Sequence, residues 1–241
     1  MMNSWHARLA TGFGMIVLGL STLAISQEEV QEQESPEQAP PNKALLATEI
    51  NEGRMNNAAQ MRNYSWNTRT EIKMDGEVKS SKVELIRFTP DGELQKAVVS
   101  DSAAGAKKPR GVRGKVAANK KKGMQEWGAE LGQLLQQYSL PTSGSILDFL
   151  DQATVQRTGN MVNLVGRNVI QQDDYMAILL DASTKQLKII TVKTSLDGDA
   201  VDVQITSKNL DDGLSYTARQ VVKVPAKKVE LTIENYDFRR Q

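Results

Sequence analysis

Side chains that could carry out covalent chemistry are scarce in this sequence. The chain holds one histidine, His6, close to its beginning, and no cysteine at all. A Ser-His-Asp or Cys-His nucleophile needs an imidazole base, and a structural zinc site needs His or Cys ligands. A mature chain that has lost the segment around His6 can build neither kind of site. We therefore predict that the protein is not an enzyme and that it holds no cofactor and no metal.

Paired carboxylates are the remaining candidates for acid-base catalysis or calcium binding. They occur as Asp173-Asp174, Asp197-Gly198-Asp199 and Asp211-Asp212. Each pair falls where a turn between two strands is expected, and aspartate is favoured there because its side chain bonds the nearby backbone. Turn formation is the preferred interpretation, and an acid-based hydrolase is the alternative.

A strongly basic segment runs from residue 105 to residue 123 and contains no acidic residue. Since the net charge of the whole chain is only +1, the remainder of the protein is acidic. Gly105, Pro109, Gly111 and Gly114 predict an irregular loop here. Three interpretations remain open: contact with an anionic surface such as lipid headgroups, nucleic-acid binding, or a solvated insertion without a partner. Nucleic acid is disfavoured because the segment lacks aromatic residues on which bases could stack. The basic residues are Lys107, Lys108, Arg110, Arg113, Lys115, Lys120, Lys121 and Lys122.

Two stretches have the apolar spacing of helices. Residues 43–62 form the first, and they carry only a thin apolar stripe. Residues 124–138 form the second, in which apolar side chains recur at helical spacing over about four turns. Gly128 and Gly132 on this second helix are expected to let a neighbouring element approach closely. A short third helix is expected after Pro141.

Most of the other residues alternate between apolar and polar, which is typical of strands with one buried face. Short turns recur throughout and predict an antiparallel arrangement. We predict an α+β fold: a curled antiparallel sheet of about nine or ten strands, forming an incomplete barrel, with an N-terminal helix and a helix pair over its concave apolar face. The strands are expected at residues 64–74, 79–88, 93–100, 153–158, 161–170, 175–181, 186–194, 199–207, 214–224 and 229–236.

The beginning of the chain has the order of a secretory signal peptide. A short, positively charged stretch precedes the apolar residues 9–25, and small residues precede an expected cleavage site after Ser26. An uncleaved membrane anchor is the alternative. Residues 27–42 are rich in Glu, Gln and Pro and are expected to form a disordered tail. We expect a periplasmic or secreted protein made of a signal peptide (1–26), this tail, and one domain over residues 43–241.

This order of helices and strands resembles the LolA/LolB-like lipoprotein carriers, a superfamily of periplasmic half-barrels. Residues 87–94 read Arg-Phe-Thr-Pro-Asp-Gly-Glu-Leu and are similar to the hairpin motif Arg-x-Pro-Gly-x-Phe-Arg-Trp of those carriers. Here an extra residue separates Arg87 from Pro90, and the second Arg and the Trp are absent. The resemblance implies a non-enzymatic carrier with an apolar cavity.

A cavity also follows from the predicted architecture. The sheet offers a larger apolar face than two or three short helices can fill, so we expect a site for a lipid or a lipoprotein acyl chain. A protein-interaction or sensor module built on the same fold is the alternative. The expected partners are a hydrophobic ligand or lipidated protein and, for the basic segment, an anionic membrane surface; the protein is expected to be a monomer. The residues expected to line the cavity are Trp66, Arg87, Trp127, Leu131, Leu134, Tyr138, Phe149 and Tyr175.

Overall fold

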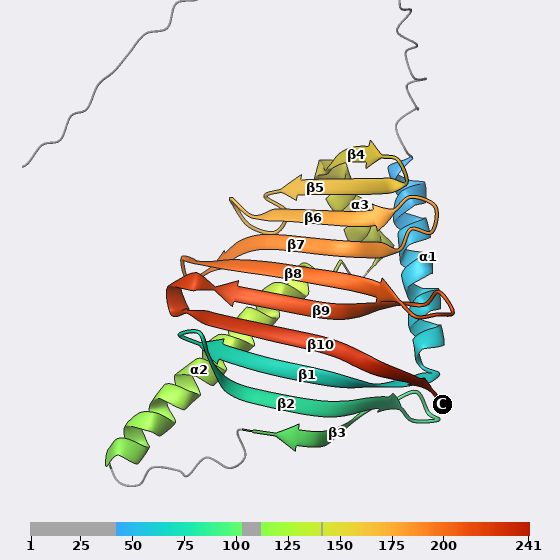
Figure 1. Cartoon of the computed structure of the whole chain (residues 1–241). Coiled ribbons are helices and arrows are strands. Elements are labelled where there is room, and N and C mark those ends of the chain that lie inside the picture. The colour runs from blue at the N-terminus through green and yellow to red at the C-terminus, as the bar shows by residue number, and fades with distance from the viewer. Residues whose placement is uncertain (1–41, 103–111, 141) are drawn as a thin grey trace, which may run out of the picture. The chain divides into compact units, whose positions relative to one another are not determined.

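The structure is a computed structural model that describes residues 42–102, 112–140 and 142–241 (Figure 1). The expected signal peptide and nearly all of the expected tail lie outside the described residues, as do residues 105–111 of the basic segment. In chain order the elements are α1 (Lys43–Met61), β1 (Tyr64–Met74), β2 (Glu77–Phe88), β3 (Leu94–Asp101), α2 (Val112–Gln137), α3 (Ser143–Gln152), β4 (Thr154–Thr158), β5 (Met161–Arg167), β6 (Tyr175–Asp181), β7 (Leu187–Leu196), β8 (Asp199–Asn209), β9 (Ser215–Val224), the short helix η1 (Pro225–Lys227) and β10 (Val229–Arg240).

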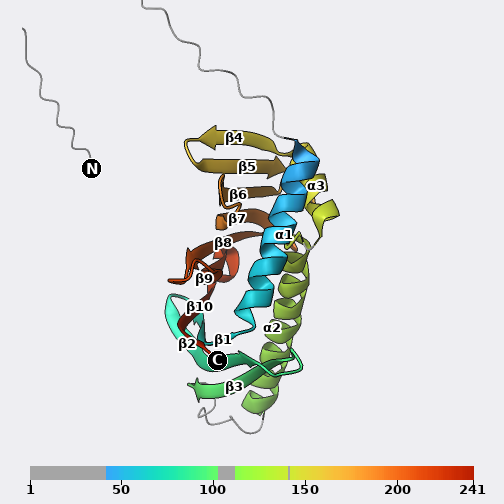
Figure 2. The same cartoon turned by 90° about the vertical axis from the view of Figure 1, so that its right-hand side faces the viewer.

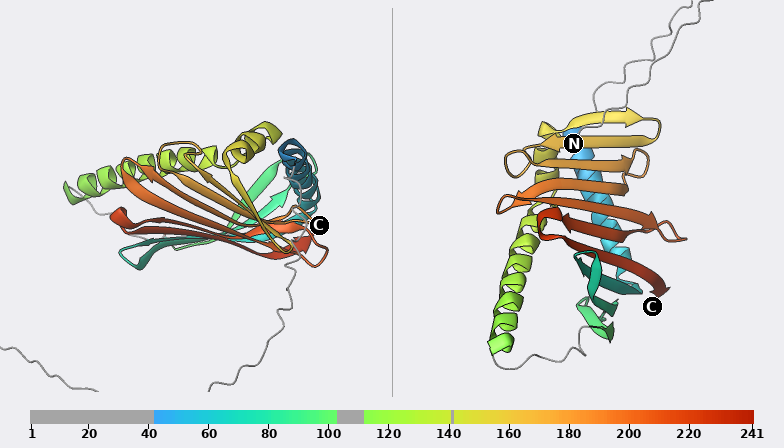
Figure 3. Two further views of the ribbon diagram at one scale, coloured as in Figure 1. Left: turned by 90° about the horizontal axis from the view of Figure 1, so that it is seen from above. Right: turned by 60° about the vertical axis from the view of Figure 1, so that its left-hand side comes forward.

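All ten strands belong to one antiparallel sheet in the order β3-β2-β1-β10-β9-β8-β7-β6-β5-β4. Neighbours in the sheet are neighbours in the chain except at β1 and β10, where Tyr64 lies opposite Arg240 and Met74 opposite Val229. This long-range pairing joins the first three strands to the last seven. Strands β3 and β4 remain as the two edges of a curled sheet that is not closed into a barrel over the described residues (Figures 1 and 3). The predicted fold class is confirmed.

Two tight turns illustrate how local chemistry sets the hairpins. Asp75 and Gly76 have φ angles of 54° and 80°, and Asp197 and Gly198 have 54° and 82°. Positive φ at both central residues matches the twist of the flanking strands. Because Gly adopts this conformation freely and Asp tolerates it, both hairpins were predictable from the sequence.

One face of the sheet, called here the inner face, is apolar and carries the three helices (Figure 2). On β6 the buried residues Met176, Ile178 and Leu180 alternate with half-buried residues that point the other way. Helix α3 buries Phe149 and helix α1 buries Ile50 in the same core. The helices therefore cover the apolar face, as the alternation of the strands predicts.

Helix α2 is longer than expected. It begins at Val112 rather than at Met124, so residues 112–123 of the basic segment are helical and do not form an irregular loop. Glycines such as Gly114 cost a helix only about 1 kcal/mol each. The neighbouring Ala, Lys and Arg residues are strong helix formers, so they offset that cost, and the glycine signal alone was misleading.

Close packing at a glycine occurs on β5 instead of on α2. A Cβ added at Gly166 would lie 2.6 Å from Cε2 of Phe149, whose side chain is 1% exposed and held by the core. A Cβ added at Gly128 or Gly132 would meet no atom within 4 Å, so the close approach expected there is wrong. The Phe149 ring therefore packs directly on the backbone of β5.

Replacement of Gly166 by Ala should push against this ring and lower the free energy of unfolding by about 1–3 kcal/mol. The matched control is Gly132→Ala, which has open space and should raise that free energy by about 0.5–1 kcal/mol because Ala is the better helix former. Urea denaturation of both variants measures the difference. An unchanged urea midpoint for Gly166→Ala would contradict the packing of Phe149 on this strand.

Candidate functional site

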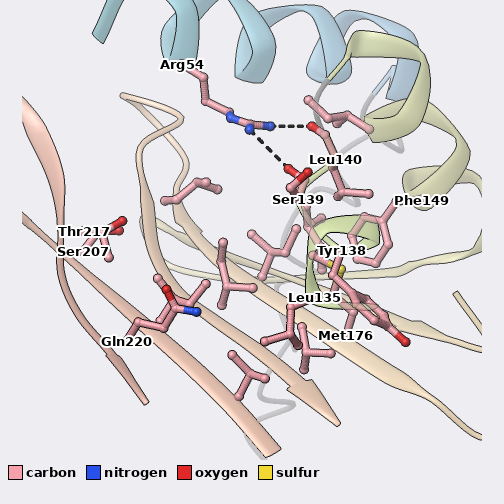
Figure 4. A pocket seen from close by; sticks show the side chains of 18 of the residues that line it. Arg54, Leu135, Tyr138, Ser139, Leu140, Phe149, Met176, Ser207, Thr217 and Gln220 are labelled. Carbon is pink, nitrogen blue, oxygen red and sulfur yellow. Dashed lines mark hydrogen bonds between the residues drawn. The ribbon is translucent and has the colours of Figure 1, made fainter. Parts of the chain in front are cut away.

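A cavity of about 480 Å³ lies between the inner face and the helices (Figure 4). Strands β5 to β9 form its floor, and α1, the end of α2 and α3 form its roof. Pockets for small ligands measure about 300–1,000 Å³, so this space suits one such molecule. The apolar lining residues are Ile50, Leu135, Leu140, Ile146, Phe149, Leu164, Met176, Ile178, Leu187, Ile190, Val192, Val203 and Ile205.

Few polar side chains reach the cavity. Ser207, Thr217 and Gln220 come from β8 and β9, and Figure 4 shows them together on one side of it. Arg54 enters from α1, above the floor of the cavity. An apolar chamber with a few polar groups gathered at one side is the usual form of a site that orients a hydrophobic ligand.

Arg54 ties α1 to the connection between α2 and α3. Its Nη1 donates to the carbonyl oxygen of Leu140 at 2.6 Å, and its Nη2 donates to that of Ser139 at 3.2 Å. These carbonyls follow the end of α2, where no further helical turn supplies donors. Burial lowers the pKa of Arg54 below its ordinary value, because a desolvated guanidinium is less stable in its charged form.

Tyr138 connects the cavity wall to a buried polar network. Its hydroxyl lies 2.7 Å from Oδ2 of Asp174 and 2.8 Å from Oγ1 of Thr194. The Asp174 carboxylate can only accept, so Tyr138 donates its one proton to Asp174 and accepts from Thr194. Thr194 in turn accepts a hydrogen bond of 2.5 Å from Nε2 of Gln171. Burial and the adjacent carboxylate raise the pKa of Tyr138 to about 12. The hydroxyl therefore stays protonated and serves as a fixed donor.

Asp174 is 2% exposed and organises the turn between β5 and β6. Its carboxylate accepts the backbone N–H groups of Val169, Ile170 and Gln171, at 2.5, 2.8 and 2.9 Å, in addition to the Tyr138 hydroxyl. Burial by itself would raise the pKa of this carboxyl, but these four hydrogen bonds outweigh burial and the pKa lies below its ordinary value. Asp174 thus holds a turn, which is the role that turn chemistry predicts.

The other carboxylate pairs also have structural partners. Asp197 occupies a hairpin turn, Asp199 forms an ion pair with Lys227 at 2.9 Å, and Asp212 accepts hydrogen bonds from Tyr64 and the backbone of Leu214. The described residues contain no group of three or more His, Cys, Asp or Glu side chains that could hold a metal ion.

The residues expected to line the cavity fall into two sets. Tyr138 and Phe149 line it, and Leu131 and Leu134 are buried in the adjoining core. Trp127 packs against the same core, where Nζ of Lys227 lies 5.6 Å from its ring centroid.

Besides Trp127, Leu131 and Leu134, three more of the expected residues do not line this cavity. Trp66 stacks on Phe238 with ring centroids 5.6 Å apart, and Arg87 donates to Gln95 on the neighbouring strand β3. Tyr175 alternates with Met176 and so points to the outer face. Aromatic character did not identify the residues that line the cavity, because the positions of the helices decide which part of the sheet is enclosed.

Two kinds of lining residue were missed. Ile190 and Ile205 lie directly opposite each other on β7 and β8, and strand alternation alone could have assigned them to the apolar face. Arg54 carried no such signal, because it is one of several polar residues on a helix with a thin apolar stripe.

Comparison with known proteins gives only remote similarities. No family model and no curated protein matches the chain. A DUF1329 family protein from Desulfovibrio piger is similar in structure, with 11% identity, a TM-score of 0.34, and coverage of 83% of this chain and 92% of that one. A LolA superfamily protein from Nitrosomonas europaea has 10% identity and a TM-score of 0.31, with coverage of 81% and 93%. The architecture rests on the elements given above and not on these remote similarities.

Among the described residues, no helix has both the length and the apolar character needed to cross a membrane.

Replacement of Asp174 by Asn should lower the free energy of unfolding by about 1–3 kcal/mol at pH 7, because four donors lose a charged acceptor. Since the folded pKa is depressed, this contribution is complete above the unfolded pKa of about 3.9 and is lost as the pH falls through the lower folded pKa. The stability gap between wild type and Asp174→Asn should therefore close only in acid.

The control for this measurement is Asp173→Asn. Asp173 is exposed with a φ of 64°, a conformation that Asn also tolerates, so this variant should unfold like the wild type. Denaturant titrations between pH 3 and pH 8 compare the three proteins. A gap that persists unchanged to pH 3 would contradict the role of the ionised carboxylate.

Proposed function

We propose that this protein is an exported binding protein that shelters one hydrophobic ligand, a lipid or the acyl chain of a lipoprotein, in the cavity beneath α1, α2 and α3. The cavity is the observation that carries the proposal. Protein interiors pack at crystal density and retain few voids larger than a water molecule. The cavity of about 480 Å³ is lined mainly by apolar side chains and lies within the range of small-ligand pockets, about 300–1,000 Å³. Space of this kind is better explained as a site for a guest.

Transfer of apolar surface out of water supplies the binding energy. Each buried methylene contributes about 0.8 kcal/mol, so even part of an acyl chain binds favourably against a wall of Ile, Leu, Val, Met and Phe side chains. No covalent step is required, which agrees with the scarcity of nucleophiles and bases. The Tyr138–Asp174 network holds the end of α2 over the cavity, so the wall is preorganised before the ligand enters.

We also propose that the protein is exported and that it contacts a membrane surface. The order of residues 1–26 supports secretion, and the basic segment supports an attraction to anionic lipid headgroups. In this arrangement the protein acts as a monomer that collects or delivers its ligand at a membrane surface.

Filling the cavity should abolish binding of the neutral fluorophore N-phenyl-1-naphthylamine. The variant Ile190→Trp/Ile205→Trp places two large rings on lining residues of adjacent strands. The control is Thr191→Trp/Gln204→Trp, which pairs the next residues in register on the outer face. We expect the first variant to bind the fluorophore at least about tenfold more weakly, and the control to bind it like the wild type.

The fluorescence titration is read together with thermal unfolding of each variant. Equal losses in both variants, or no binding by the folded wild type, would contradict the proposed site. In that case the protein-interaction module remains as the function of this fold.

Neutralising part of the basic segment should weaken attachment to anionic membranes. Each Lys or Arg near such a surface contributes about 1 kcal/mol, so Lys120→Gln/Lys121→Gln/Lys122→Gln should reduce partitioning onto phosphatidylglycerol vesicles by about tenfold or more. Vesicle co-sedimentation at low and high salt measures the effect. Lys188→Gln/Lys193→Gln/Lys208→Gln, which removes the same charge from the β7–β8 region, is the control, and an equal loss there would show that net charge alone matters.

A further inference from the structure

The cavity adjoins a second, smaller hollow of more polar character. This outer hollow measures about 300 Å³ and shares Arg54, Leu187, Ser207 and Thr217 with the cavity. A molecule that spans both would have one end among apolar side chains and the other among polar ones. The remaining residues of the outer hollow are Gly53, Asn57, Thr184, Lys185, Gln186, Ser215 and Tyr216.

Two cations border the outer hollow, and they differ in their partners. Lys185 forms an ion pair with Glu49 at 3.5 Å and donates to the carbonyl oxygen of Ala182 at 2.7 Å. Arg54 has two carbonyl partners but, within the described part of the chain, no Asp or Glu forms an ion pair with it. Arg54 is therefore the cation whose charge an incoming group could balance.

The guanidinium of Arg54 has more N–H donors than its two carbonyl partners use. A guanidinium has five N–H donors, and the carbonyls of Ser139 and Leu140 accept from one Nη each. Carbonyl oxygens satisfy hydrogen bonds without neutralising the charge. Because burial already disfavours the charged form of Arg54, an anion here would gain more than it would beside a solvated side chain.

The side-chain amide of Asn57, by contrast, already has hydrogen-bond partners for both its oxygen and its nitrogen. Its Oδ1 accepts from the backbone N–H of Ser215 at 2.8 Å, and its Nδ2 donates to the carbonyl oxygen of the same residue at 2.7 Å. This reciprocal pair fixes α1 to the first residue of β9. Ser207 and Thr217 border both hollows, as Arg54 does.

We propose that the ligand is a single-chain amphiphile with a compact anionic headgroup, a carboxylate or a phosphate monoester, whose head pairs with Arg54 in the outer hollow while its chain fills the cavity. This inference rests on the proposed binding of a hydrophobic ligand and names its class. Ser207 and Thr217 donate to the headgroup oxygens, and Arg54 supplies the charge-assisted hydrogen bonds. A neutral molecule with the same chain gains the apolar contacts alone.

Displacement of N-phenyl-1-naphthylamine by laurate, dodecyl phosphate and dodecanol tests this assignment on the full chain. These compounds share one chain length and differ in headgroup. Wild type should bind at least one of the two anions about tenfold more tightly than dodecanol, and the stronger of the two identifies the headgroup. The preference should shrink at high salt, since screening weakens the pair.

Arg54→Gln should lose the preference for the anions, measured as the ratio of their affinities to that of dodecanol in the same variant. Arg54→Lys keeps the charge and should retain part of the preference, and Lys185→Gln, which removes the cation already paired with Glu49, should retain most of it. Thermal unfolding without ligand establishes that each variant is folded.

The outcomes separate this inference from the function on which it rests. If Arg54→Gln weakens dodecanol and laurate equally, Arg54 only holds the helices together and the headgroup assignment is wrong. Equal affinity of wild type for all three compounds also overturns it, although a hydrophobic site remains. Failure of every compound to displace the fluorophore, or no fluorophore binding, removes the proposed function itself.

Discussion

The structure depends on a difference in apolar area: the inner face of the sheet offers more than the helices that cover it can fill. Ten strands curl into a single sheet, and strands β5 to β9 place apolar side chains on its inner face. Three helices cover that face, and one of them, α1, buries only Leu46, Ala47 and Ile50. Apolar side chains of the sheet that the helices do not contact leave a chamber. The cavity is thus a consequence of how much surface the sheet offers and how little the helices supply.

Polar contacts decide where the helices lie over that chamber. Tyr138 anchors the end of α2 to the buried Asp174, and Arg54 anchors α1 to the residues that follow α2. The first contact is saturated, because the carboxylate accepts four hydrogen bonds and the hydroxyl has both its partners. The second is unsaturated, because a charged guanidinium faces only carbonyl oxygens. This difference separates a structural residue from a candidate binding residue within one site.

Much of the fold was predictable because its signals are local. The alternation in Val201, Val203 and Ile205 assigns the buried face of β8, and Asp-Gly pairs with positive φ mark two hairpins. The start of α2 was not predictable in the same way. Glycines in the basic segment suggested a loop, whereas the helix formers around them carry the helix back to Val112. Candidate site residues were predictable where they lay on the strongest apolar stripe, as Tyr138 does.

The sequence by itself determined most of the element types and the antiparallel character of the sheet, because both depend on residue identity and short-range spacing. Tertiary structure alone decided which inner residues border the cavity and which cation reaches it. Those properties depend on the packing of α1, the end of α2 and α3 over β5 to β9, contacts between residues far apart in the chain. Arg54 has no distinguishing neighbours in sequence, and only the packing of three helices on a curled sheet makes it the polar end of an apolar site.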